Sequence, residues 1–83
     1  MSKSIYEIAG EVNSLFNEKS VRGEAYPLTD NKLEVHIKGD WKHDHIYGKE
    51  LLYNKYNCDI ECIEVYDNES DWYEAMYHVQ IKA

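Results

Sequence analysis

The stretch WYEAMYHVQI, residues 72–81, alternates two kinds of side chain along its length. Successive side chains of a β-strand point to opposite faces of the sheet, so residues two apart share a face. The apolar phase holds Tyr73, Ala75, Tyr77, Val79 and Ile81, and the other phase holds Trp72, Glu74, Met76, His78 and Gln80. The pattern therefore predicts a strand with one face on a core and one face open to solvent.

The segment before this strand predicts its hairpin partner. Residues 59–66 are rich in β-branched side chains, and a polar turn follows them. The apolar residues change phase within this segment, since Ile60 and Cys62 fall in one phase and Ile63 and Val65 in the other. A β-bulge near Cys62 and Ile63 would bring both pairs to the same face.

Further elements precede the hairpin, and each has its own signal of periodicity or turn chemistry. They are a helix at 4–19 capped by Ser4, strands at 21–28 and 33–38, and a helix that begins between Asp40 and Asp44 and ends near Tyr56. The order α-β-β-α-β-β predicts an α+β fold, a single small domain over residues 1–83. We expect an antiparallel four-stranded sheet with two helices packed on one face.

The net charge of −7 is concentrated in the last third of the chain. Residues 56–83 carry seven acids and one base, whereas residues 1–55 carry nine acids and eight bases. A field of this sign repels nucleic acid and membrane surfaces and favours a basic protein surface as partner. The N-terminus has no apolar secretion signal and no apolar run approaches the roughly 20 residues of a membrane span. We expect a cytoplasmic protein of a bacterial cell, with no direct contact to nucleic acid or membrane.

The stretch WKHDH, residues 41–45, is the most site-like short motif. His43, Asp44 and His45 stand between a predicted strand and a predicted helix, and we expect His36 and His78 on the open side of the sheet. This set supports one alternative function, a small metal-binding protein or metal-dependent hydrolase. In the ordinary structural interpretation, Asp44 caps the helix and both neighbouring histidines lie on the surface. No other catalytic motif is present, no cofactor is expected, and enzymatic activity stays open.

Cys58 and Cys62 suggest a zinc site by their type, but their spacing on a strand opposes one. Residues four apart in an extended chain are separated by about 13 Å. Two thiolates that bind one zinc, each ~2.3 Å from the metal, cannot lie so far apart, and neither can the two halves of a disulfide. We expect two small core thiols in a reducing compartment.

The acids of the last third are spaced along the predicted hairpin, with aromatic residues among them. Residues two apart in an extended chain are separated by ~6.6 Å, comparable with the roughly 6–7 Å between successive phosphates of a nucleic-acid strand. A turn at 67–70 would break this regularity, and a merely solvated acidic hairpin is the ordinary alternative. The expected partner-binding residues are Asp59, Glu61, Glu64, Asp67, Glu69, Asp71, Trp72 and Glu74.

The stretch DIECIEVYDNESDWYE, residues 59–74, gives the chain a family resemblance in general character. With its small size, acidity, tyrosine content and α+β pattern, the chain resembles the small acidic inhibitors encoded by phages and mobile elements, such as anti-CRISPR proteins and other DNA mimics. The resemblance implies a nuclease effector as target, inhibited by blocking its access to nucleic acid or PAM. No residue role is carried over from those families. A structural subunit that forms a homodimer through Trp72 and Met76 on the open sheet face is a further alternative.

Overall fold

The computed structural model describes residues 3–69 and 72–82, except for the side chains of 67–69. Its elements are α1 (Ile5–Glu18), β1 (Gly23–Thr29), β2 (Lys32–Asp40), a π-helical segment η1 (Trp41–Ile46), α2 (Tyr47–Lys55), β3 (Cys58–Glu69) and β4 (Trp72–Ile81). The predicted element order and α+β class are confirmed. The second predicted helix begins at Trp41, within the expected interval, but its first part has π geometry. No helix in the described ranges is long and apolar enough to cross a membrane.

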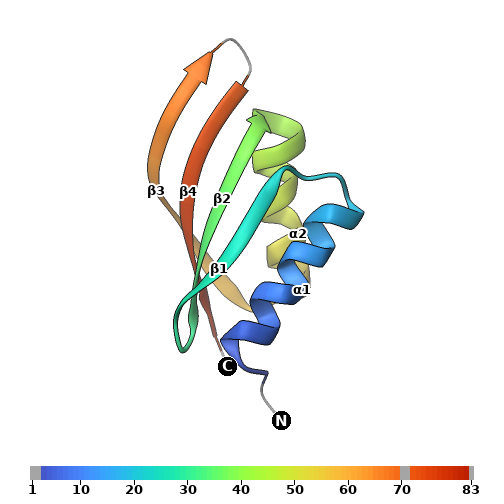
Figure 1. Cartoon of the computed structure of the whole chain (residues 1–83), viewed down its shortest axis with the longest axis vertical. Coiled ribbons are helices and arrows are strands. Elements are labelled where there is room, and N and C mark those ends of the chain that lie inside the picture. The colour runs from blue at the N-terminus through green and yellow to red at the C-terminus, as the bar shows by residue number, and fades with distance from the viewer. Residues whose placement is uncertain (1–2, 70–71, 83) are drawn as a thin grey trace.

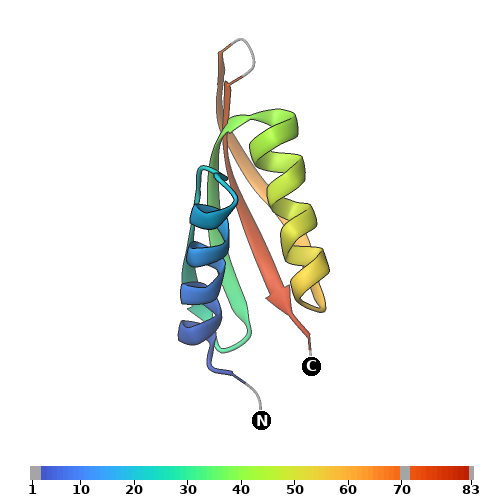
Figure 2. The same cartoon turned by 90° about the vertical axis from the view of Figure 1, so that its right-hand side faces the viewer.

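The four strands form one antiparallel sheet in the order β1-β2-β4-β3. Both helices lie on the same side of this sheet, to the right of it in Figure 1 and in front of it in Figure 2. α1 packs mainly on β1, η1 packs on β2, and α2 contacts β3. The predicted arrangement, with two helices on one face, is therefore confirmed, and it leaves the opposite face of the sheet open.

The core lies between the sheet and the helices, and the predicted alternation fills it. Val35, Ala75 and Tyr77 point into it from β2 and β4, while Val12 and Phe16 meet them from α1. Each large apolar side chain that leaves water here contributes about 1.5–3 kcal/mol. The Oγ atom of the predicted cap residue at position 4 accepts a hydrogen bond of 3.2 Å from an amide of the first turn of α1, which satisfies one of the unpaired amides at that end.

β3 contains two bulges. The register pairs on either side of them are Cys62 with Tyr77 and Glu64 with Met76, then Val65 with Ala75 and Asp67 with Glu74. Ile63 and Tyr66 are thus the extra residues of the two bulges. The bulge predicted near Cys62 and Ile63 is confirmed, and the second was not predicted. The expected turn at 67–70 is wrong for 67–69, because β3 continues through Glu69.

The two cysteines have different environments. Cys58 is buried where α2 covers the start of β3, with its Sγ 3.8 Å from the carbonyl oxygen of Leu52, and burial raises the pKa of its thiol. Cys62 is exposed. The expectation of two core thiols is therefore wrong for Cys62, because residues 61–66 of this edge strand lie beyond the cover of the helices.

Candidate functional site

The WKHDH motif is organised around a buried carboxylate. Asp44 is fully buried, and its oxygens accept hydrogen bonds from the backbone amides of Arg22 at 3.1 Å and Asp40 at 2.8 Å. The guanidinium of Arg22 adds an ion pair at 3.3 Å. The helix cap is Asp40, which accepts from the amide of His43 at 2.7 Å. The prediction that Asp44 is the cap is wrong, because β2 runs on to Asp40 and the helix starts one residue later.

Gly39 makes room for this carboxylate. Its φ angle is +122°, a backbone conformation that side chains with a Cβ rarely adopt. A Cβ atom built there would lie 2.1 Å from Asp44 Oδ2. Glycine at this position is therefore required for the Asp44 carboxylate to reach the two amides.

His45 is a buried structural histidine. Its Nε2 lies 3.0 Å from the carbonyl oxygen of Tyr73 and its Nδ1 lies 2.8 Å from the hydroxyl of Tyr77. Since a carbonyl only accepts, Nε2 carries the proton and Nδ1 accepts from the tyrosine. Burial lowers the pKa of His45, and the bond to the Tyr73 carbonyl and the nearby Asp44 charge oppose this only in part. The expectation that both histidines of the motif lie on the surface holds for His43 and is wrong for His45.

The four residues of the metal-binding alternative do not converge. Asp44 and His45 use their polar atoms as just described, and His43 Nε2 lies 3.2 Å from the carbonyl oxygen of Ser20. His78 is on the other face of the sheet, 3.9 Å from Glu34. Over residues 3–69 and 72–82, no group of three or more histidine, cysteine or carboxylate side chains is arranged to hold a metal ion.

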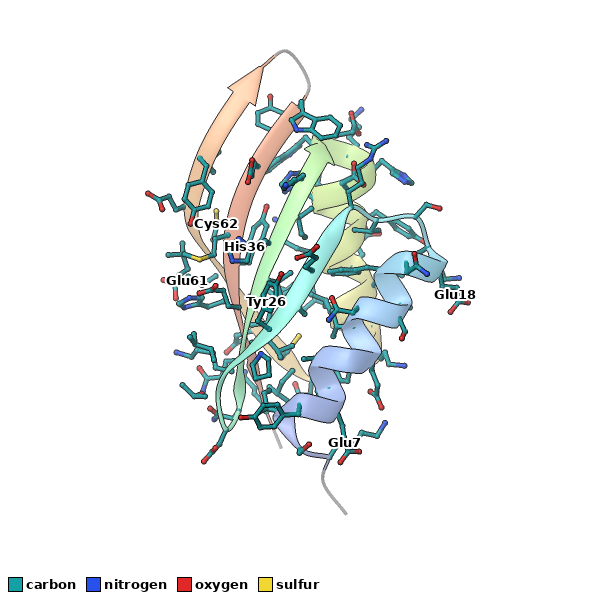
Figure 3. The ribbon with its side chains drawn as sticks, in the orientation of Figure 1. Glu7, Glu18, Tyr26, His36, Glu61 and Cys62 are labelled. Carbon is teal, nitrogen blue, oxygen red and sulfur yellow. The ribbon has the colours of Figure 1, made fainter. Side chains whose placement is uncertain are left out.

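The face of the sheet opposite the helices, here called the open face, gathers most of the predicted partner-binding residues. Directly paired residues on neighbouring strands point to the same face, so the register defines its members. They are Glu24, Tyr26 and Thr29 on β1, Lys32, Glu34, His36, Lys38 and Asp40 on β2, Trp72, Glu74, Met76, His78 and Gln80 on β4, and Asp59, Glu61 and Glu64 on β3. Figure 3 shows Tyr26, His36 and Glu61 along the sheet, whereas Glu7 and Glu18 lie on α1.

The two bulges align the acids of β3 in one row. Glu61, Glu64 and Asp67 are three residues apart in sequence, which would alternate faces on a regular strand. The first bulge absorbs Ile63, so Glu61 and Glu64 share the open face with Asp59, and the second bulge brings the backbone of residue 67 into the same register phase. The side chains of Asp67 and Glu69, and the whole of Asp71, are outside what the structure describes.

Several carboxylates of the open face surround one tyrosine. The Tyr66 hydroxyl lies 3.7 Å from the Met76 sulfur. Desolvation raises the pKa of Tyr66, and the negative charges of Glu64, Glu34 and Glu74 raise it further. These acids come from β3, β2 and β4, so three strands contribute to one region of negative potential. Tyr66 was expected among the aromatic residues that lie between the acids, whereas Glu34 was not predicted as part of the site; the alternation of residues 33–38 was the signal that placed Glu34 on this face.

Some acids of the open face form ion pairs with basic side chains of the described part of the chain. Glu34 lies 2.8 Å from His36 Nε2, and Asp59 lies 3.0 Å from Lys82 Nζ. In the described part of the chain, no lysine or arginine forms a salt bridge with Glu61, Glu64 or Glu74.

Trp72, the aromatic residue predicted to anchor a partner, is 45% exposed. The guanidinium carbon of Arg22 lies 5.0 Å from its ring centroid, within cation–π range. An intramolecular cation therefore already covers part of this indole, and a partner would meet the part that remains exposed.

Replacement of Gly39 by alanine tests the Asp44 arrangement. We expect Gly39→Ala to lower the free energy of unfolding by at least about 2 kcal/mol, because it combines backbone strain with displacement of a buried carboxylate. Gly10→Ala is the matched control, since a Cβ there meets nothing within 4 Å and should stabilise the exposed helix by about 0.5–1 kcal/mol. Urea unfolding measures both, and equal effects of the two substitutions would contradict the assignment.

The lowered pKa of His45 predicts a pH dependence of stability. The folded protein holds the neutral ring, while the unfolded chain takes up a proton near the ordinary pKa of 6.5. Stability from this residue is therefore complete above that pH and decreases as the pH falls below it. Urea unfolding from about pH 7 to pH 5 should show a steeper loss for the native chain and for His43→Gln than for His45→Gln. Parallel curves for all three proteins would refute this role.

Comparison of the chain with protein-family models, with curated proteins and with solved structures finds no match. The arrangement of the open face and of the buried WKHDH motif is therefore the basis for a functional proposal.

Proposed function

We propose that this protein is an inhibitor, of anti-CRISPR or DNA-mimic type, that uses its open face to cover a basic nucleic-acid-binding surface of a nuclease effector in the bacterial cytoplasm. The observation that carries the proposal is the row of Asp59, Glu61 and Glu64 on β3, which the bulge at Ile63 holds on one face of the sheet. Glu61, Glu64 and Glu74 lack lysine or arginine partners among the described residues. They therefore keep their charge available for a basic partner.

The acids of the open face outnumber its lysines. Only Lys32 and Lys38 share this face with the acids of the described strands, and Lys38 is directly paired with Glu74. A solvated protein surface usually mixes charges of both signs more evenly. A cationic surface placed against this face would meet Glu61, Glu64 and Glu74, so charge complementarity would favour binding.

Apolar and aromatic side chains lie among the acids and would add contact area. Tyr66 is 49% exposed and Tyr26 is 47% exposed, and Met76 lies against the Tyr66 hydroxyl. Charge complementarity increases the rate of encounter, whereas buried aromatic anchors slow dissociation. The open face supplies both kinds of contact on one surface.

Neutralising the acids that have no lysine or arginine partner among the described residues tests this function. A triple variant, Glu61→Gln with Glu64→Gln and Glu74→Gln, should reduce the association rate with a basic nuclease by about tenfold or more at low salt. The measurement is surface-based binding kinetics against a panel of RNA-guided and other basic nucleases at two salt concentrations. The wild-type rate should fall as salt rises, because salt screens the attraction.

The matched control changes the same net charge on the helices. Glu7, Glu18 and Glu50 are exposed, and a variant with all three replaced by glutamine should bind within about twofold of the wild type. Equal losses for the two triple variants, or binding that no added salt weakens, would contradict recognition by the open face.

A further inference from the structure

The two edges of the sheet differ in their capacity to accept another strand. At the β1 edge, the side-chain amide of Asn13 bonds both backbone groups of Ala25, receiving from its amide at 2.8 Å and donating to its carbonyl oxygen at 3.0 Å. Pro27 lies on the same strand and has no N–H to offer. α1 packs along this strand as well. The β1 edge is thus closed by its own chain.

The β3 edge is not closed in this way. β3 is the last strand of the sheet order; Cys58 at its start is buried and Ile60 half-buried, whereas Asp59 and residues 61–66 are exposed. In the ranges that the structure describes, no backbone hydrogen bond joins β3 to an element other than β4. An edge strand of this kind presents a row of unpaired N–H and C=O groups that can pair with another extended chain.

The side chains beside this edge specify what such a chain must carry. On the open face the edge is flanked by Asp59, which is ion-paired with Lys82, and by Glu61, and on the helix face by Ile60 and Cys62. A second copy of β3 would place acids beside acids, which opposes self-pairing. A strand that alternates lysine or arginine with apolar residues would place cations beside the acids and apolar side chains beside Ile60 and Cys62.

Regular pairing has a limited length at this edge. The first bulge interrupts the ladder at Ile63, so the uninterrupted segment is 58–62. Bulges and charges are also the means by which sheets avoid indiscriminate edge pairing. The bulge at Ile63 and the acids oppose pairing with a second copy of β3. They therefore leave a short segment of the edge, 58–62, that favours a basic strand.

We propose that the outer edge of β3 accepts an extended segment of the partner, with alternating basic and apolar residues, as a fifth strand of the sheet. This inference rests on the proposed function and names how the basic partner is held. The added strand would lie about 4.8 Å from β3. Its basic side chains would lie along the row of acids that continues across the open face.

Two synthetic peptides of the same charge test strand addition. The first alternates lysine with valine over about nine residues. The second has the same sequence with methyl groups on consecutive central backbone nitrogens, which prevents strand pairing and keeps every charge. NMR titration of the labelled protein measures both affinities and locates the contact, and amide exchange reports new hydrogen bonds at 58–62.

We expect the unmethylated peptide to bind about tenfold more tightly or better than the methylated one, through added backbone hydrogen bonds. It should slow amide exchange at 58–62. Glu61→Lys should weaken this binding at least as strongly, while Glu18→Lys, the same change on α1, should leave it within about twofold. Figure 3 shows both positions.

The outcomes separate this inference from the function on which it rests. Equal binding of the two peptides, or a contact confined to the open face around Tyr26 and His36, overturns strand addition while charge recognition by the open face stands. Failure of both peptides to bind also overturns strand addition. The open-face function is judged separately, by the nuclease kinetics of the two triple glutamine variants.

Discussion

The buried carboxylate of Asp44 is the interaction on which the arrangement of the chain depends. A carboxylate removed from water is costly unless hydrogen bonds satisfy its oxygens, and here two backbone amides and Arg22 do so. These bonds fix η1 against the start of β1 and the end of β2. His45 is consequently held against Tyr77, and α2 follows on the same side of the sheet as α1. With both helices on one side, the acids of the other face stay accessible.

Much of this fold could be predicted from local sequence patterns, because successive side chains of a strand point to opposite faces of the sheet. The alternation at 72–81 and 33–38 was sufficient to assign the faces of β4 and β2. The burial of His45 and the exposure of Cys62 could not be predicted, since both depend on where the helices end relative to the sheet. The second bulge depends on the register between β3 and β4. Its one trace in the sequence is the three-residue spacing of Glu61, Glu64 and Asp67.

The same bulges connect the fold to the proposed function. A regular strand with these acids would have sent part of its charge to the helix face, where Cys62 and Val65 now point. By absorbing Ile63, β3 keeps Glu64 on the same side as Asp59 and Glu61, and the Tyr66 bulge brings this tyrosine next to Met76. A local departure from regular pairing thus adds to the charge that β1, β2 and β4 give this face. In the sequence, the WKHDH motif resembled a functional site more than the acids did. In the structure, its Asp44 and His45 hold η1 against the sheet.

The bonds between Asn13 and Ala25 have a consequence for the size of any assembly. A sheet that can be extended at both edges can propagate from molecule to molecule without limit, as in fibres. Here one edge is terminated by a side chain of the protein itself. Any complex formed by strand addition is therefore finite, with one added strand for each copy of the chain. Asn13, with Pro27 and α1, would thereby limit such a complex to the β3 edge.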